Sequence, residues 1–201
     1  MKESATSKVL KSVVSKEGTR PILECVHYAN GNVVATDSHQ LVRFNNVFED
    51  RDFEATINIF SLLPSNQKYP DVTRVIPKEF NLTASFSTDI VKDLVKFLKV
   101  VKKDVIIMNL TDANSINISV QDSGMKYSIP VANKISDPSN APEKVATVAQ
   151  YLLHALQYIP DMIKDDKATG DITIGFTKEL QPLKLTFDSM EFVISPVRLR
   201  H

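Results

Sequence analysis

Two side chains near the start of the chain could carry out acid–base chemistry together. Asp37 and His39 stand two positions apart, and a carboxylate beside an imidazole can orient it as a general base. No serine or cysteine with a nucleophile motif accompanies them, and the single cysteine, Cys25, lies in an apolar-rich segment. An aspartate near a histidine more often forms a structural hydrogen bond, so we expect no enzyme.

The histidines and the cysteine do not suggest a metal site. His27, His39, His154 and His201 share no metal-ligand spacing such as i, i+4. One cysteine excludes both a disulfide framework and a cysteine-built zinc centre, and it suits a reducing compartment. No P-loop or dinucleotide fingerprint occurs either. The sequence therefore predicts neither a metal nor a cofactor.

Lysines gather on two segments that are expected to be helical. Along residues 88–103 they recur every three or four positions opposite an apolar stripe, and residues 6–15 carry two more. The set comprises Lys8, Lys11, Lys92, Lys96, Lys99 and Lys103. Such lysines are typical of a solvated helix face, and lysines also hold duplex DNA through its phosphates. Lys+Arg and Asp+Glu both number 24, so a DNA-binding surface would need local charge segregation.

Hydrophobic periodicity predicts the elements that position these side chains. Apolar residues at helical spacing indicate helices over 6–15, 88–103 and 149–159, the last one ended by Pro160. Apolar and alternating runs predict a larger number of short strands. These strands are 22–28, 33–37, 40–44, 53–60, 104–109, 114–120, 125–131, 144–148, 171–176, 182–187 and 191–197.

Turn residues predict how the strands are connected. Asn30-Gly31 between two β-like runs predicts a two-residue hairpin turn, because both central positions need a positive φ. The proline-containing stretch 61–79 and the polar stretch 134–144 are expected to be connectors without regular structure.

The order of these elements indicates the fold class. Residues 80–201 read as strand, helix and three strands, twice over, and residues 1–78 hold about one such unit. We therefore expect an α+β fold in which helices line one face of curved antiparallel sheets, with domains at 1–78 and 79–201. No apolar run approaches the ~18 residues of a membrane span. The N-terminus lacks the apolar core of a signal peptide, so a cytoplasmic location is expected.

Three motifs, in this order, resemble the bacterial sliding clamp family, the β subunit of DNA polymerase III. VATDSHQLVR (34–43) is similar to a V-A-T-D-G-H-R-L-A segment in the middle domain of the clamp. YPDVTRVIP (69–77) resembles the F-P-D-Y-R-R-V-L-P connector between the middle and last domains, and EFVISPVRL (191–199) resembles the clamp C-terminus. VATVAQYLLHAL (145–156) is also similar to a strand and helix of the last domain.

The resemblance covers only part of a clamp chain, which has three similar domains. The first domain has no counterpart here, and the first two motifs lie about half as far apart as is usual in the family. The resemblance therefore implies a DNA-clamp fold of about one and a half domains, with a shortened middle domain (1–78) and a complete last domain (79–201). A phage or mobile-element version of the clamp would fit this pattern.

The resemblance also implies a groove between the middle and last domains that binds short peptides. The residues that match its positions are Thr36, Ser38, His39, Gln40, Leu41, Pro70, Arg74, Val75, Tyr151, Ile194, Ser195, Pro196, Val197 and Arg198. The aliphatic members, Ile194 among them, would form apolar walls, and the histidine and arginines would bind peptide carbonyls or carboxylates. Ser38 stands where the family has a glycine, and Gln40 where it has an arginine.

Two functions from different classes follow from these patterns. In the first, the chain is a non-enzymatic processivity factor that tethers polymerases and clamp loaders by Gln/Leu/Phe-type peptides. It holds duplex DNA without reading sequence, and the resemblance implies that the six lysines face the DNA, since clamp helices line the central channel. A clamp ring has six domains, so three or four chains would associate, through a strand edge uncovered near residues 53–60. In the second, the chain is a peptide-binding module without ring closure, a decoy or regulatory factor that need not touch DNA.

Overall fold

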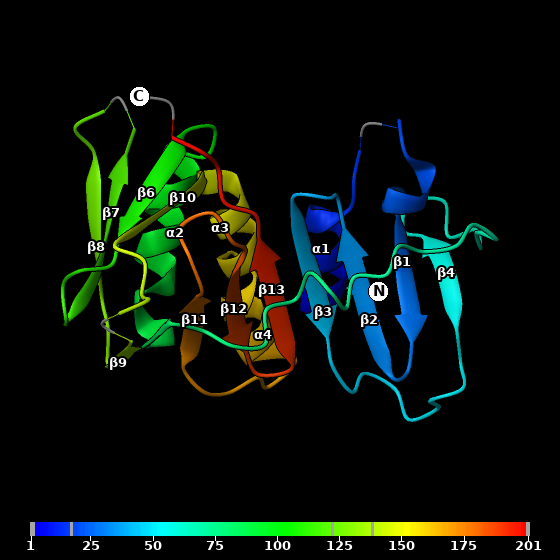
Figure 1. Ribbon diagram of the computed structural model, residues 1–201. Helices are drawn as coiled ribbons and strands as arrows, with labels where there is room; N and C mark the ends of the chain where they lie inside the picture. The colour runs from blue at the N-terminus through cyan, green and yellow to red at the C-terminus, as the bar shows by residue number, and fades with distance from the viewer. Residues whose placement is uncertain (1–2, 17, 122, 138, 200–201) are drawn as a thin grey trace.

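The computed structural model describes residues 3–16, 18–121, 123–137 and 139–199, so that His201 lies outside the described residues. Within these residues the strands form two antiparallel sheets (Figure 1). The larger sheet contains, in spatial order, β4 (Ala55–Asn58), β1 (Cys25–Ala29), β2 (Asn32–Thr36), β3 (Gln40–Phe44), β13 (Met190–Ile194), β12 (Leu183–Phe187), β11 (Ile172–Phe176), β5 (Leu82–Phe86) and β9 (Asn133–Ser136). The smaller sheet contains β10 (Lys144–Val148), β6 (Val105–Asn109), β7 (Ser115–Val120) and β8 (Lys126–Pro130).

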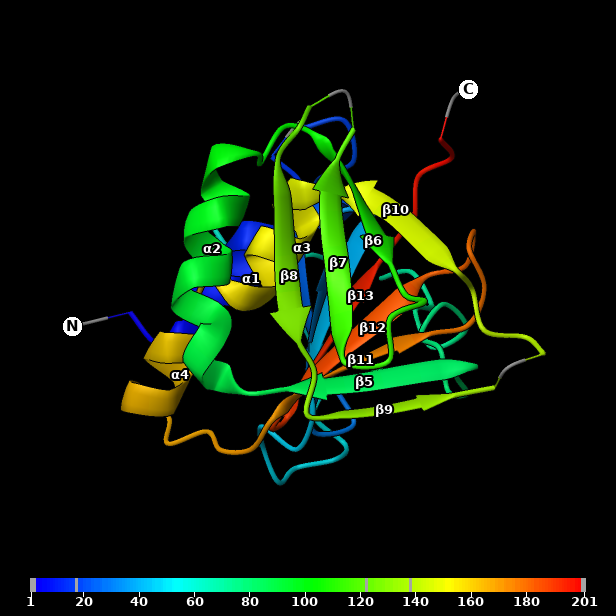
Figure 2. The same ribbon diagram turned by 90° about the vertical axis from the view of Figure 1, so that its left-hand side faces the viewer.

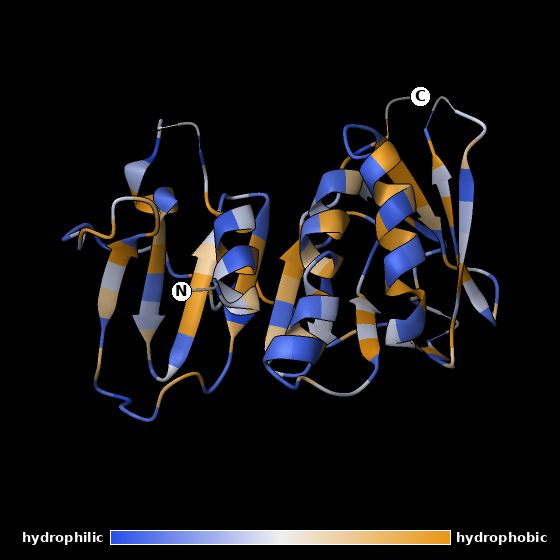
Figure 3. Cartoon of the chain, turned by 180° about the vertical axis from the view of Figure 1, so that it is seen from behind, coloured by the Kyte–Doolittle hydropathy of each residue, from blue (hydrophilic) through white to orange (hydrophobic). Residues whose placement is uncertain are grey.

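The helices gather on one face of the larger sheet. They are α1 (Ala5–Val13), α2 (Val91–Val100), α3 (Ala149–Leu156) and α4 (Ile159–Asp165), with 3₁₀ turns η1 (Pro21–Glu24) and η2 (Thr88–Ile90). Figure 2 shows them on one side of the molecule, beside the smaller sheet, and Figure 3 shows them together from behind with polar and apolar bands alternating along them. The expected α+β architecture is therefore confirmed.

The amphipathic pattern of the helices explains why they pack there. In α1 the Ser4 side chain accepts a hydrogen bond from the Ser7 N–H (3.2 Å) and so caps the first turn. The buried side chains of α1 and α2 recur at helical spacing, and they join one apolar core with the inner face of both sheets. These buried residues are Ala5, Val9, Leu10, Val13, Val91, Leu94, Val95 and Leu98.

The predicted hairpin is confirmed. Asn30 and Gly31 have φ of 53° and 78°, and they join β1 to β2 with Tyr28 opposite Val33. These positive φ values are why an Asn-Gly pair suits this turn.

Three local predictions were wrong. Pro160 does not end a helix but lies in the first turn of α4, where its missing N–H costs no hydrogen bond. The start of the expected strand 22–28 is instead the 3₁₀ turn η1. Part of the polar stretch 134–144 forms β9, which pairs with β5, because a partner far along the chain offered a free edge.

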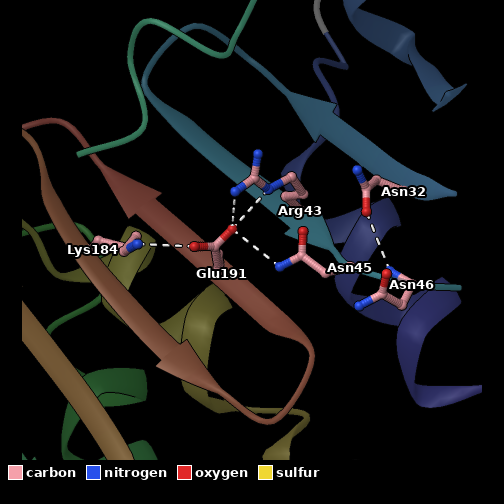
Figure 4. A network of polar contacts seen from close by, with 6 residues as sticks. All are labelled: Asn32, Arg43, Asn45, Asn46, Lys184 and Glu191. Atoms are coloured by element: carbon pink, nitrogen blue, oxygen red, sulfur yellow. Dashed lines mark hydrogen bonds and ion pairs between the residues drawn. The ribbon is translucent and has the colours of Figure 1, made fainter. Parts of the chain in front are cut away.

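The larger sheet runs without a break from the first part of the chain into the second, because β3 pairs with β13 (Figure 4). Glu191 on β13 stabilises this junction through hydrogen bonds. It accepts hydrogen bonds from the Arg43 guanidinium, from Asn45 Nδ2 (3.2 Å) and from Lys184 Nζ (2.9 Å). Burial alone would raise the pKa of Glu191, but these donors outweigh it and lower the pKa to about 2. The division into domains at residue 78 remains a prediction.

The strand edge expected near residues 53–60 exists, since β4 is the terminal strand of the larger sheet. Part of this edge is covered by the chain itself. Asn58 N donates to Leu63 O (2.9 Å), and Ser65 N donates to Thr56 O (2.8 Å). The following segment therefore occupies outward-facing backbone groups of β4 that a second chain would need for pairing. Among the described residues, no helix is long and apolar enough to span a bilayer.

Candidate functional site

The segment 61–79 crosses the face of the larger sheet that the helices leave open. Figure 1 shows it passing in front of β2, β3 and β13. Tyr69 and Ile76 from this connector are buried against side chains of the strands beneath, and together they form a second, small apolar cluster. The strand residues of this cluster are Cys25, Val34, Leu41 and Val193.

A pocket of about 230 Å³ opens beside this cluster, between the connector, the β2–β3 turn and the end of β13. Residues from all three sequence motifs meet in it. The predicted groove residues that line it are Thr36, Ser38, His39, Gln40, Leu41, Pro70, Val75 and Ser195. The structure thus brings together predicted residues as far apart in the sequence as Thr36 and Ser195.

The β2–β3 turn is held rigid by its own side chains. The Asp37 carboxylate accepts hydrogen bonds from the backbone N–H groups of His39 and Gln40 (2.8 Å each), and the Thr36 hydroxyl donates to Gln40 O (2.7 Å). Asp37 therefore caps a turn, and the His39 ring stacks on Tyr151 of α3, with centroids 6.2 Å apart. Ser38 has a φ of 82°, a left-handed conformation that suits the glycine of the family motif.

Gln40 ties this turn to helix α3 and is only 4% exposed. Its amide donates to Asp37 Oδ2 (2.9 Å), and its oxygen lies 3.1 Å from His154 Nδ1. Burial lowers the pKa of His154 to about 4, against an opposing effect of Asp37, so the imidazole is neutral at pH 7 and donates from Nδ1. No spacing in the sequence predicts this contact, because His154 lies 114 positions from Gln40.

Several predicted groove residues lie outside the pocket. Tyr151, Pro196 and Val197 are partly exposed, and Arg198 is exposed. The tail that carries the last three is held next to the pocket, because Ser195 N donates to His39 O (2.9 Å). Arg74 lines a neighbouring cavity instead.

Ile194 does not form a wall of the groove. It is fully buried in the main core, and Val193 lines the pocket in its place. Successive strand residues face opposite sides of a sheet, so Phe192 and Ile194 point to the helices while Val193 points to the connector. Because residues of a strand face its two sides in turn, this alternation was the signal that could have identified Val193 as the residue that lines the groove.

Four other lining residues were not predicted, and two of them, Leu23 and Pro182, had no signal in the sequence. Leu23 enters from η1, which was expected to be part of a strand, and Pro182 enters from the β11–β12 turn. Asp71 and Val72 belong to the connector motif but were not singled out.

The predicted DNA-facing lysines divide into two groups. Lys8, Lys11 and Lys96 form ion pairs with Asp161 (2.6 Å), Glu3 (2.8 Å) and Asp93 (2.7 Å) respectively. Among the described residues, no carboxylate lies within ion-pair distance of Lys92, Lys99 or Lys103, all of which are exposed. The described residues also hold no group of three or more histidines, cysteines and acids that could bind a metal ion.

The sheets, the helix-covered face and the groove together define a structural class, the clamp fold of bacterial DNA polymerase III β subunits. No protein-family model matches the sequence, and no curated protein matches it. Solved structures, by contrast, do match the fold of this chain. The β chain of DNA polymerase III from Streptococcus pneumoniae matches with a TM-score of 0.78 and 18% identity, covering 97% of this chain and 62% of that one.

Two further solved structures agree. The β subunit from Thermotoga maritima has a TM-score of 0.75 and 13% identity, and the match covers 98% of this chain and 65% of that one. The DNA polymerase sliding clamp from Bacillus subtilis has a TM-score of 0.70 and 18% identity, with 98% and 62% covered. The expected clamp fold is therefore confirmed, and the chain spans less than two thirds of each of these clamps.

Proposed function

We propose that the chain is a sliding-clamp-like tether that binds short peptide segments of replication proteins in the groove. The observation that carries this proposal is the convergence of the β2–β3 turn, the connector and the end of β13 around one pocket. Leu41, Val75 and Val193 give it apolar walls, and Ser38 and His39 offer polar groups at its rim. An apolar hollow with a few polar groups is the usual form of a site for a short peptide.

The expected ligand is a peptide with a glutamine followed by leucine and phenylalanine. Each apolar side chain that is buried in the groove would contribute about 1.5–3 kcal/mol. After the cost of ordering the peptide, we expect a dissociation constant in the micromolar range, roughly −8 kcal/mol.

The decisive variant is Val75→Asp. Val75 lines the pocket but is 51% exposed, so a carboxylate there should leave the fold intact and abolish peptide binding. The matched control is Val47→Asp, because Val47 is 48% exposed and lies outside the pocket. Calorimetric titration of the peptide against the three proteins measures the effect. Equal affinity for Val75→Asp and wild type would contradict the groove proposal.

Within this proposal the chain is a non-enzymatic processivity factor of a DNA polymerase in the cytoplasm, and duplex DNA lies along the helix-covered face. The exposed lysines of α2 that lack a described acidic partner support this part. DNA would be held through its phosphates without sequence preference. Polymerase and clamp-loader peptides would be the protein partners.

A second candidate is a clamp-like module that binds peptides without closing a ring. Two observations favour it: the connector covers part of the β4 edge, and half of the predicted lysines are neutralised by ion pairs. Retention on circular against linear duplex DNA separates the two candidates. A ring should stay on circular DNA and slide off linear ends, whereas an open module should show no difference.

A further inference from the structure

A second cavity lies directly beside the groove. It has a volume of about 740 Å³, and it is formed by residues 73–79 of the connector together with the β11–β12 turn. Val75 and Pro182 line both hollows, and we call this shared apolar pair the Val75–Pro182 ridge. Val75 is half exposed, so a chain lying in the groove can continue over this ridge.

The volumes of the two cavities suggest that one ligand occupies both. The groove, at about 230 Å³, is smaller than the ~300–1,000 Å³ of ordinary ligand sites and has room for few side chains. The neighbouring cavity lies within that range. An extended peptide crossing the Val75–Pro182 ridge would fill both cavities with adjacent residues.

The lining of the second cavity has a distinct chemistry. Val75, Ile76, Pro77 and Pro182 provide apolar surface, while Arg74, Lys78 and Glu79 provide the charged groups. Asp71, which lies 3.7 Å from Arg74 Nε, brings a second carboxylate to the edge of this hollow, so the cations matter only to the extent that they are free to bind another partner.

Neither cation is engaged strongly. The Arg74 side chain is 89% exposed, and its ion pair with Asp71 is long, at 3.7 Å. Lys78 is exposed, and no carboxylate of the described residues lies within ion-pair distance of it. Both side chains are therefore available to a carboxylate from outside.

We propose that this second cavity determines the specificity of the groove by binding the flank of the same peptide. An apolar residue lies on the Val75–Pro182 ridge, and a carboxylate next to it faces Arg74 and Lys78. The carboxylate comes from an aspartate or glutamate side chain or from the peptide's own C-terminus. This inference rests on the proposed peptide-binding function and adds the chemistry of the partner to it.

The test compares labelled peptides that share one Gln…Leu…Phe core. They carry two aspartates, two alanines or two lysines on either side of the core, and each is made with a free and with an amidated C-terminus. Affinities are measured by fluorescence anisotropy. On one side of the core, the aspartate-flanked peptide should bind more tightly than the alanine-flanked one, and that one more tightly than the lysine-flanked one. Each difference in affinity should be about threefold to tenfold. An advantage of the free over the amidated C-terminus would identify the chain end as the source of the carboxylate.

Lys78→Glu should remove the preference for the acidic flank, so that the ratio of the affinities for the aspartate-flanked and alanine-flanked peptides falls to about one or below. Lys164→Glu is the matched control, because it makes the same charge change at an exposed position of α4, on the helix-covered face. The preference should weaken with added salt in the wild type.

Three results would overturn the inference. Core binding without any flank preference contradicts it and leaves the groove proposal standing. Absence of binding by every peptide contradicts both. A loss of duplex DNA retention in Lys78→Glu, with peptide affinities equal for all flanks, would assign these cations to nucleic acid instead.

Discussion

Ser38 occupies a backbone position that suits glycine, with a φ of 82°. A side chain in this region costs about 1–2 kcal/mol, whereas glycine loses more backbone entropy on folding, by about 0.5–1 kcal/mol. We therefore expect Ser38→Gly to raise the free energy of unfolding by about 0.5 kcal/mol in urea denaturation. Ser128→Gly in β8 is the control and should lower that free energy, because this strand has no need for a positive φ. A decrease in Ser38→Gly would show that the turn tolerates serine without strain.

Glu191 makes folding stability dependent on acid pH. Its pKa is about 2 in the folded chain against an ordinary value of 4.5, so its contribution is complete above about pH 5. That contribution is lost as the pH falls towards 2, where the carboxyl group becomes protonated in both states. Glu191→Gln should lower the free energy of unfolding at pH 7 by about 2 kcal/mol. It should also make the free energy of unfolding decrease less between about pH 5 and pH 2 than it does in the wild type.

Urea unfolding measured across this pH range tests the prediction. The exposed Glu49→Gln is the control and should change stability by less than about 0.5 kcal/mol. If the free energy of unfolding of Glu191→Gln depended on pH in the same way as that of the wild type, the stability of the junction would not depend on this carboxylate.

Helix α2 is the element on which DNA binding depends in the proposed function. Lys96 is paired with Asp93, whereas Lys92 and Lys99 have no acidic partner within the part of the chain that the structure describes. The double change Lys92→Glu with Lys99→Glu should reduce retention on duplex DNA and make the salt dependence shallower, by about one unit of slope per lost phosphate contact. Retention is measured by electrophoretic mobility at several salt concentrations. Unchanged salt-sensitive binding would identify α2 as an ordinary solvated helix.

A control for the helix variants lies on the opposite face. Lys68 and Lys178 are exposed and belong to the connector and the β11–β12 turn. Changing both to glutamate alters the net charge by the same amount, so it separates a local contact from a general electrostatic effect. DNA retention should be affected much less than in the α2 variant.

For the whole molecule, ring formation requires association between chains. We predict a concentration-dependent rise in mass through sheet edges, and we expect it to be weak, with dissociation constants of roughly 100 µM (about −5.5 kcal/mol). The reason is that the segment after β4 already occupies part of one edge. Analytical ultracentrifugation over a range of concentrations measures the mass. A strict monomer at every concentration would exclude a ring and favour the open peptide-binding module.

Ser65→Pro tests the cause of the weak association. This change removes the N–H that donates to Thr56 O, one of the two hydrogen bonds that cover the β4 edge, and so frees that carbonyl for a second chain. Association should become stronger than in the wild type. A variant that associates no more strongly than the wild type would show that the exposed edge of β4 is not the contact surface.

The sequence by itself determined the features that depend on near neighbours. Helical spacing of apolar residues indicated α1, α2 and α3, the Asn30-Gly31 pair indicated its hairpin, and three short motifs indicated which segments meet at the groove. These features follow from local backbone preferences and from the burial of apolar stripes, both of which can be read within a few residues.

Only the tertiary structure decided what depends on distant partners. Val193 and not Ile194 faces the groove, because the helices cover one face of the sheet and the connector covers the other. Gln40 bonds to His154, which is 114 positions away, and Lys8 pairs with Asp161, 153 positions away. The charge and polarity that a side chain presents are set by the groups packed against it, and no spacing in the sequence specifies which groups those will be.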